Sequence, residues 1–316
     1  MENRYMFKGK DIISTKNLSR DEIEYIIDKA EKFEPIAEGK GYSDILKGKV
    51  LGLAFFQPST RTKNSFELAM RKLGGIVTGF GNPSGTAIDK GESLEDTVKV
   101  LETYSDILVI RHPKAGVPAQ VANLLDIPVI NGGDNSNQHP TQALLDIYTI
   151  KKEKKEIDGL KIAFISDVPH SRTVKSLTYA LSNFDVQMYF VGIEKYQIPD
   201  DMKRDLEKRD IKISQVESIG SIVSEVDFIY SEFRGGLLLD EKYENKKERE
   251  YVKEKMFIDK KTLEDAKPDL KIMHPLPRFE ELSVDIDNTP HALYFQQAKN
   301  GLPLRMALIS SILGKC

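Results

Sequence analysis

Cysteine and tryptophan are nearly missing from this chain of 316 residues, which contains one cysteine, Cys316, and no tryptophan. A single cysteine at the last position excludes a disulfide framework, a zinc site built on thiolates and a catalytic cysteine held in a structured core. Every apolar run is far shorter than the length of about 18 residues that a membrane-spanning helix needs. Residues 1–10 hold no apolar stretch for a signal peptide. We therefore expect a cytoplasmic protein with no membrane among its partners.

An excess of charge of one sign is also missing. The chain has 46 lysines and arginines against 49 aspartates and glutamates, a net charge of −3, which gives no global reason to bind nucleic acid. The sequence lacks GxxxxGK[ST], a GxGxxG turn after a strand, HExxH and GxSxG. These absences argue against the usual nucleotide, dinucleotide, zinc and serine-hydrolase sites. We expect no metal and no cofactor, so that a substrate is activated by positioning and electrostatics alone.

Short apolar runs alternate along the chain with segments of helical period. The runs predict strands at 49–56, 76–80, 107–110 and 129–131, and then at 161–166, 186–191, 226–230 and 271–274. This alternation of apolar strands with helical segments favours parallel sheets that are covered by helices on both faces. The predicted fold class is α/β, with two doubly wound domains, each a mostly parallel sheet flanked by helices, and a cleft between the domains.

Two charged stretches bear on the organisation of the chain. Seven of the eight residues 151–158 are charged, which predicts a solvated helix end and linker between the domains. We place the first domain at 1–149, completed by a C-terminal helix that spans roughly 296–316, and the second at 150–295. Thirteen of the twenty residues 241–260 are charged. This composition favours a solvated helix or mobile excursion over a partner-binding segment.

A run rich in hydroxyl groups follows the predicted strand at 49–56. Phe66, Met70 and Leu73 then recur at helical spacing, and Gly74 stands where such a helix should end. Unpaired N–H groups at the start of a helix attract anions. A serine that only caps the helix would need one hydroxyl, whereas this start offers several. We interpret it as a phosphate-sized anion site formed by Ser59, Thr60, Arg61 and Thr62.

Two further segments follow predicted strands of the first half. Arg111 comes directly after the strand at 107–110. Ligands of open parallel sheets bind beyond the carboxyl ends of the strands, so an arginine at this place is suited to bind an oxyanion. His139 precedes Pro140, which fits a first helical position, and Gln142 lies three residues further on, on the same face. A lone histidine there is usually a capping residue. The neighbouring Gln142 favours a site in which both side chains contact one planar amide-like group.

The second half offers an arginine and a rigid loop, each after a predicted strand. Arg172 follows the strand at 161–166 and can form a bidentate pair with a carboxylate. Pro275 and Pro277 fix the backbone after 271–274, so that carbonyls there can accept hydrogen bonds from a bound –NH2 group. A loop that is merely rigid remains the alternative. The two halves together fit a small phosphorylated electrophile and a carboxylate-bearing molecule.

Taken in order, these segments resemble the aspartate/ornithine carbamoyltransferase family over nearly the whole chain. Besides 59–62, the matching pieces are Arg111-His112-Pro113, Gln138-His139-Pro140-Thr141-Gln142, Arg172-Thr173, His274-Pro275-Leu276-Pro277-Arg278, Tyr294-Phe295-Gln296-Gln297-Ala298 and Asn300-Gly301. Pro275 stands where the ornithine branch usually has a cysteine, which favours the aspartate branch. The resemblance implies transfer of the carbamoyl group of carbamoyl phosphate to L-aspartate in pyrimidine biosynthesis, without a metal or a covalent enzyme intermediate.

The resemblance also implies roles for single residues. Those expected to bind the phosphate are Ser59, Thr60, Arg61 and Thr62. Those expected to polarise the carbonyl are Thr62, Arg111 and His139. The carbamoyl amino group would be held by Gln142 and by the carbonyls of Leu276 and Pro277. Arg172 would bind a carboxylate of the amino-acid substrate. Lys90, preceded by Thr86 at the place of a family serine, would reach into a neighbouring subunit's site, which implies a homotrimer. The sequence leaves open whether a regulatory chain attaches.

Two departures concern the second substrate. Gln57 stands where aspartate-type enzymes commonly carry a glutamate. The family's Thr-Arg-x-Gln motif, which holds the side-chain carboxylate of aspartate, is replaced here by Tyr-Ser-Glu-Phe-Arg-Gly-Gly at 230–236. Arg234 comes one residue late, Gly236 occupies the place of the glutamine, and Glu232 adds a negative charge. We favour a one-residue loop shift that leaves Arg234 functional over a changed acceptor.

Three hypotheses remain after the resemblance. The chain is a carbamoyltransferase acting on aspartate, a carbamoyltransferase acting on another amino-acid amine, or a non-catalytic paralogue that binds ligands or partners. The third is disfavoured because a paralogue without activity has no reason to keep Arg61, Arg111, His139 and Gln142 together. The first two differ in the choice of acceptor.

Overall fold

The chain divides into two compact units. Unit 1 comprises Met1–Tyr148 and Asn300–Cys316, and unit 2 comprises Thr149–Lys299. The computed structural model describes residues 6–232 and 246–316. Two helices contribute residues to both units, namely α5 (Pro140–Lys154) and α9 (Tyr294–Ile312).

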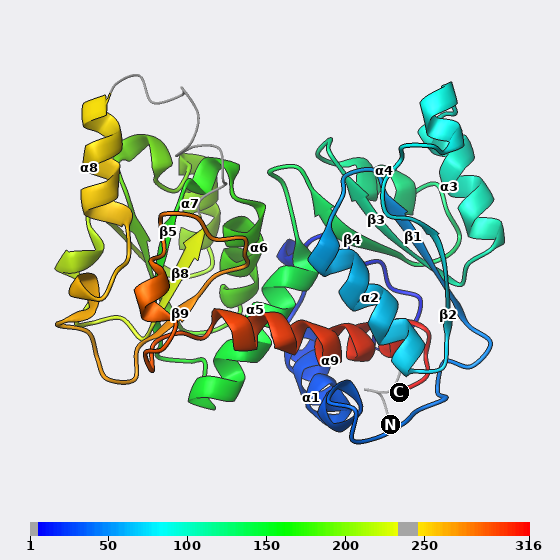
Figure 1. Ribbon diagram of the computed structural model, residues 1–316, viewed down its shortest axis with the longest axis horizontal. Coiled ribbons are helices and arrows are strands. Elements are labelled where there is room, and N and C mark those ends of the chain that lie inside the picture. Colours follow the sequence, from blue (N-terminus) through cyan, green and yellow to red (C-terminus); the bar gives the residue numbers. More distant parts are fainter. Residues whose placement is uncertain (1–5, 233–245) are drawn as a thin grey trace. The chain divides into compact units, whose positions relative to one another are not determined.

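Unit 1 contains, within its described residues, a four-stranded parallel sheet in the order β2-β1-β3-β4 (Figure 1). The strands are β1 (Val50–Phe55), β2 (Ile76–Phe80), β3 (Ile107–His112) and β4 (Val129–Asp134). The helices, besides parts of α5 and α9, are α1 (Arg20–Ala37), α2 (Thr60–Lys72), α3 (Leu94–Thr103) and α4 (Val117–Ala122). Strands β1, β3 and β4 are buried along almost their whole length. Ligands of such doubly wound sheets bind at the carboxyl ends of the strands.

Unit 2 holds a five-stranded parallel sheet in the order β7-β6-β5-β8-β9, counted over its described residues. The strands are β5 (Lys161–Ser166), β6 (Gln187–Val191), β7 (Lys212–Val216), β8 (Phe228–Glu232) and β9 (Lys271–Met273), and the helices are α6 (Arg172–Leu181), α7 (Asp200–Glu207) and α8 (Lys246–Met256). Val252 and Met256 of α8 pack into the core on one face, and Figure 1 shows α6 on the other. The predicted fold class, two parallel sheets flanked by helices, is confirmed.

Local sequence signals explain where the helices of unit 1 begin and end. The Ser19 hydroxyl accepts the backbone N–H of Glu22, and the Glu22 carboxylate accepts the N–H of Ser19, so that a capping box starts α1. Leu73 caps the end of α2, and Gly74 follows with φ of +80°, a conformation that glycine adopts without strain. The end of helix α2 is thus fixed by local backbone geometry, and its first turn follows β1.

Three sequence expectations about strands need correction. Strand β7 was not foreseen, because its pattern is largely polar and it lies at the sheet edge with no fully buried residue. Arg111 belongs to β3 rather than to the loop after it, since the main-chain pairing with β1 extends to Phe55 opposite Arg111. Residues 132–134, which lie beyond the strand expected at 129–131, form the end of β4 and are buried. The second and third corrections place polar groups on the sheet that were expected in loops.

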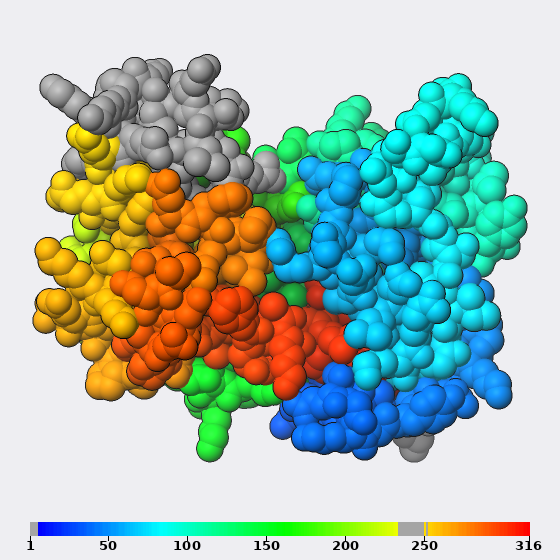
Figure 2. All heavy atoms as spheres, viewed as in Figure 1, coloured from blue at the N-terminus to red at the C-terminus, as the bar shows by residue number. Residues whose placement is uncertain are grey.

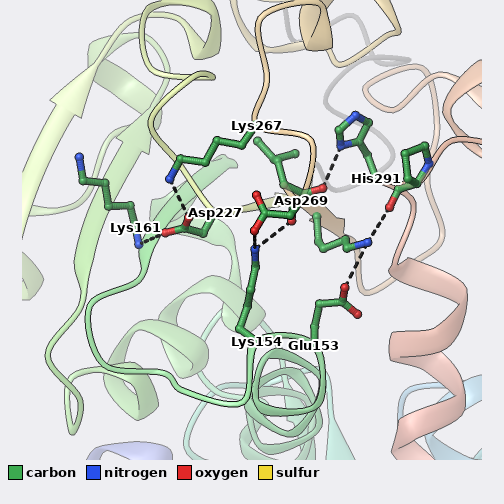
Figure 3. Close-up of polar contacts among 10 residues, drawn as sticks. Glu153, Lys154, Lys161, Asp227, Lys267, Asp269 and His291 are labelled. Atoms are coloured by element: carbon green, nitrogen blue, oxygen red, sulfur yellow. Dashed lines mark hydrogen bonds and ion pairs between the residues drawn. The ribbon is translucent and has the colours of Figure 1, made fainter.

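The charged segment 151–158 is more strongly tied to unit 2 than expected. The Lys154 side chain is only 13% exposed and pairs with the Asp269 carboxylate at 2.5 Å. The neighbouring Glu153 pairs with Lys271, the first residue of β9, at 3.1 Å. Figure 3 shows these contacts at the end of α5. Glu153 and Lys154 therefore fasten the helix end to β9 and to the residues just before it.

No helix within residues 6–232 and 246–316 combines the length and the apolar character needed to cross a membrane.

Candidate active site

The start of α2 has the form of an anion site. Ser59 occupies the N-cap position, but its hydroxyl makes no capping hydrogen bond to the helix. The hydroxyl of Ser19, by contrast, does cap α1. Partial burial lowers the pKa of the Arg61 guanidinium, which remains a cation at neutral pH. Ser59 therefore does not act as a simple helix cap. The first turn of α2 presents backbone N–H groups, hydroxyls and a positive charge in one place, which suits an anion.

Three of the predicted residues converge at the carboxyl edge of the unit 1 sheet. Thr62 Oγ1 lies 3.4 Å from His139 Nε2, and both side chains are buried. Arg111 is 8% exposed, and its Nη1 donates to the Gly132 carbonyl at 3.0 Å. The backbone N–H of Phe56, just before α2, donates to the Arg111 carbonyl at 2.9 Å. The structure thus places the three residues at or just after the ends of β1, β3 and β4, where their side chains are donors of the kind that suits an oxyanion.

Asp134 organises the approach to His139, a role that the sequence reading missed. Its carboxylate is 1% exposed and accepts from Asn131 Nδ2 at 2.9 Å, from the backbone of Gln138 at 2.9 Å and from that of Gly116 at 2.8 Å. Asn and Asp side chains commonly bind nearby backbone groups in turns. That preference, in the run Asn-Gly-Gly-Asp, was the signal available in the sequence. The contacts fix the chain between β4 and the first residue of α5.

Gln142 follows in the first turn of α5. Its Nε2 donates to Asp146 Oδ1 at 2.8 Å. Since the amide nitrogen is engaged in this way, the amide oxygen is the atom suited to accept an N–H from a ligand. Helix α5 begins at Pro140, as predicted, and its first turn contains both Gln142 and the buried Thr141.

Lys90 lies in a different part of unit 1. It is exposed, at the end of the short 3-10 helix Ala87–Lys90, which Thr86 caps by accepting the N–H of Ile88. In Figure 2, α3 and the segment before it (cyan) form part of the surface of unit 1. The contacts described within unit 1 do not join Lys90 to Thr62 or His139, so its role across a subunit boundary stays a prediction.

The predicted carboxylate-binding residue of unit 2, Arg172, is the first residue of α6. Its neighbours Ser171 and Thr173 both donate their hydroxyls to the Glu232 carboxylate, the second at 2.7 Å. Strand pairing places Glu232 opposite Ser166, at the carboxyl edge of the sheet. The negative charge that the sequence indicated therefore lies at the helix start that contains Arg172. Arg234 and Gly236 lie outside the described residues.

The loop after β9 is held by a buried pair. His274 Nδ1 accepts the Leu276 N–H at 2.8 Å, so the ring hydrogen is on Nε2 and points to Glu281 Oε1 at 2.9 Å. Glu281 also accepts the Phe279 N–H at 3.0 Å, and the His274 and Glu281 side chains are fully buried. The sequence reading attributed the stiffness of this loop to Pro275 and Pro277 and missed Glu281. The carbonyls predicted to bind a ligand, those of Leu276 and Pro277, thus belong to a rigidly held segment.

The same loop is fastened at its far end by Arg278. Its guanidinium forms a bidentate ion pair with Asp287 and donates to the Tyr294 hydroxyl at 3.0 Å. The hydrogen bonds from Arg278 and then Tyr294 hold the pKa of Asp287 at about 2. Burial, together with the hydrogen bond to Asp287, raises the pKa of Tyr294 to about 12. Arg278 is therefore engaged in holding the loop.

Comparison with known proteins extends the likeness to the whole chain. A domain family described as "Aspartate/ornithine carbamoyltransferase, carbamoyl-P binding domain" matches residues 10–152, and the corresponding "Asp/Orn binding domain" matches residues 158–312. The aspartate carbamoyltransferase catalytic subunit of Methanosarcina mazei is 44% identical over 309 residues, 98% of each chain. That of Methanobrevibacter smithii is 45% identical over 309 residues, 98% of this chain and 96% of the relative.

Solved structures agree with this pattern. The catalytic subunit of aspartate transcarbamoylase from M. jannaschii is 41% identical, with a TM-score of 0.88 over 96% of this chain and 98% of that one. The Trypanosoma cruzi enzyme, solved in complex with carbamoyl phosphate and aspartate, is 32% identical, with a TM-score of 0.90 over 98% of this chain and 97% of that one. The agreement in sequence and in fold runs through both units, and the chain belongs to the aspartate/ornithine carbamoyltransferase family.

Proposed function

We propose that this protein transfers the carbamoyl group of carbamoyl phosphate to the α-amino group of L-aspartate, giving N-carbamoyl-L-aspartate and phosphate, a step of pyrimidine biosynthesis. The observation that carries the proposal is the convergence of Thr62, Arg111 and His139 at one sheet edge. The names of the curated relatives support aspartate as the acceptor. The complex of the Trypanosoma cruzi enzyme with carbamoyl phosphate and aspartate supports the substrate pair.

In the proposed reaction the first turn of α2 binds the phosphate group. Ser59, Thr60 and Arg61 supply hydroxyls, N–H groups and a positive charge to it. Thr62, Arg111 and His139 donate to the carbonyl oxygen and stabilise the oxyanion that forms when the amine attacks. The new N–C bond forms as the C–O bond to phosphate breaks, and the departing phosphate takes up a proton from the amine. No group of the protein forms a covalent intermediate.

The other predicted residues orient the two substrates. Gln142 and the carbonyls of Leu276 and Pro277 accept the hydrogens of the carbamoyl amino group. Arg172 binds a carboxylate of aspartate, a task in which Arg234 takes part. Held in this way, the two substrates have the amine of aspartate next to the carbonyl carbon of carbamoyl phosphate. This positioning accelerates the reaction without any additional catalytic group from the protein.

Lys90 completes the site of a neighbouring subunit, so that the active form is a homotrimer in the cytoplasm. Its exposed position supports a role across a subunit boundary. A regulatory chain is not part of the proposal.

One observation favours a second candidate, the same transfer to a different amino-acid amine. Glu232 accepts hydrogen bonds from Ser171 and Thr173, on either side of Arg172. A carboxylate there opposes the binding of a second acidic group. An acceptor with a neutral or basic side chain would avoid that repulsion.

A colorimetric ureido assay with carbamoyl phosphate and a panel of amino acids tests both candidates. The panel includes L-aspartate, L-asparagine and L-ornithine, and His139→Ala serves as the inactive control. The proposal predicts carbamoyl aspartate as the main product, identified by mass spectrometry. Product with another amine but not with aspartate would establish the second candidate, and no product with any amine would contradict carbamoyl transfer.

A further inference from the structure

Two buried residues of opposite charge lie among the helices of unit 1 that contain Thr62 and Gln142. Arg305 of α9 is 4% exposed and Asp146 of α5 is fully buried. Burial lowers the pKa of Arg305 to about 10, against the attraction of Asp146, which acts to raise it. Buried charges are costly unless they are paired and hydrogen-bonded. A pair at this place therefore calls for an explanation.

Asp146 contacts the predicted ligand-binding residue Gln142. Its Oδ1 accepts from Gln142 Nε2 at 2.8 Å, one helical turn earlier on α5. A side-chain amide can present either its oxygen or its nitrogen to a neighbour, whereas an ionised carboxylate only accepts. Asp146 therefore turns the nitrogen of Gln142 toward itself, which directs the oxygen of the same amide to the other side.

Arg305 supplies the countercharge and joins three helices. Its Nη1 donates to Ser65 Oγ of α2 at 2.8 Å, and its Nη2 lies 3.5 Å from Thr141 Oγ1 of α5. Its guanidinium also stacks over the Phe66 ring, 5.1 Å from the ring centre. Helices α2 and α5 contain Thr62 and Gln142 respectively, so Arg305 fixes the two elements that approach the ligand. The two residues are thus built into the frame of the site.

We propose that Asp146, with Arg305 as its countercharge, is a positioning residue that orients the Gln142 amide so that its oxygen accepts the carbamoyl –NH2 group. The inference rests on the proposed function, because it assumes that Gln142 binds the carbamoyl group. Beyond that function, the inference says that binding of the –NH2 end of carbamoyl phosphate depends on Asp146, which acts through Gln142. Binding of the phosphate end does not depend on Asp146. An amide oriented the other way would present its own N–H hydrogens to the –NH2 group, a repulsive contact.

The test compares two probes that differ in the amide group. Phosphonoacetamide, in which a methylene group replaces the bridging oxygen of carbamoyl phosphate, keeps the –NH2 group on a stable backbone, and inorganic phosphate lacks it. Titration calorimetry measures the Kd of each probe for the full chain and for Asp146→Asn, whose neutral amide no longer dictates the orientation of Gln142. We expect Asp146→Asn to raise the Kd of phosphonoacetamide about tenfold, the usual effect of one lost hydrogen bond, and that of phosphate by less than about twofold.

A double-mutant cycle separates positioning from general damage. Asp146→Asn should add nothing to the effect of Gln142→Ala in the double variant, because both changes remove the same hydrogen bond. Asp106→Asn is the matched control, since Asp106 accepts from Val50 N and Lys49 Nζ at the opposite end of the sheet. It should lower Tm and leave the ratio of the two Kd values unchanged.

A second variant guards against misfolding caused by an unpaired Arg305. Asp146→Asn combined with Arg305→Met removes both buried charges, a change that proteins often tolerate. Because Arg305 also contacts Ser65 of α2, this variant should bind both probes less tightly, but it should still weaken phosphonoacetamide more than phosphate. Equal weakening of both probes, full additivity with Gln142→Ala, or unchanged phosphonoacetamide binding in both variants would overturn the inference. Wild-type protein that binds phosphate but not phosphonoacetamide would instead overturn the proposed function, and the inference with it.

Discussion

Replacing Arg111 by methionine perturbs the donor group most directly, because methionine keeps an unbranched chain and removes the cation. The loss of one preorganised donor to a developing oxyanion costs ~10²–10³ in kcat. The Gly132 carbonyl, which accepts from Arg111 Nη1 at 3.0 Å, also loses its donor, at a cost of about 1.5–3 kcal/mol in stability. That cost is smaller than the total stability of a typical domain, about 5–15 kcal/mol. The variant should therefore remain folded while its turnover collapses.

The assay is the initial rate of ureido product at saturating carbamoyl phosphate and acceptor, with Tm measured on the same samples. Arg71→Met is the matched control, because Arg71 also lies in unit 1 but its side chain is 57% exposed and pairs with Glu67 on the surface of α2. Such a surface pair contributes at most about 1 kcal/mol, so the control should retain wild-type kcat. If Arg111→Met keeps more than about one tenth of wild-type kcat, its assignment as an oxyanion donor is wrong.

Three further predictions follow from the described contacts. Glu281→Leu removes the acceptor of the buried His274 Nε2–H and of the partly buried Phe279 N–H, which should lower the free energy of unfolding by about 2–5 kcal/mol, measured with urea. Because the pKa of Asp287 is about 2, below the ordinary 3.8, its ion pair with Arg278 stabilises the fold above about pH 4 and loses this effect as pH falls through 2. After allowance for solvent screening, Asp287→Asn should cost about 1 kcal/mol at pH 7, and most of this cost should be gone near pH 2. Inactive Lys90→Ala and His139→Ala chains, mixed after mild dissociation, should regain activity, because hybrid trimers contain sites with both side chains intact.

Each of these outcomes has a clear opposite. A wild-type urea midpoint for the Glu281 variant would show that the buried pair does not hold the loop. A stability difference for the Asp287 variant that persists unchanged to pH 2 would contradict the ion pair as its cause. Mixtures that stay inactive, although the chains exchange, would show that Lys90 does not complete a neighbouring site.

The strands and the first turn of α2 were predictable because their signals are local. Continuous apolar runs marked the buried strands, and the helical spacing of Phe66, Met70 and Leu73 marked α2, whose end at Gly74 follows from backbone geometry. Strand β7 escaped because an edge strand with polar alternation buries too little to leave a hydrophobic signature.

The supports of the site were much harder to predict than its motifs. Asp134, Asp146 and Glu281 are buried carboxylates in a chain with 49 acidic residues. Apart from the Asn-Gly-Gly-Asp run that ends at Asp134, nothing local marks them as buried, because burial depends on tertiary packing even where the hydrogen-bond partners are close in sequence. Asp146 and Arg305, for example, are brought together only when α9 packs in unit 1. Sequence patterns therefore identified residues that face a ligand better than the residues that hold them.

A crystal structure with phosphonoacetamide bound tests the central claim most directly. We expect the phosphonate at the first turn of α2, with the carbonyl oxygen within hydrogen-bonding distance of Thr62 Oγ1, Arg111 and His139 Nε2. A phosphonate bound elsewhere, or a carbonyl oxygen that contacts none of these three side chains, would contradict the account of how this protein activates the carbamoyl group.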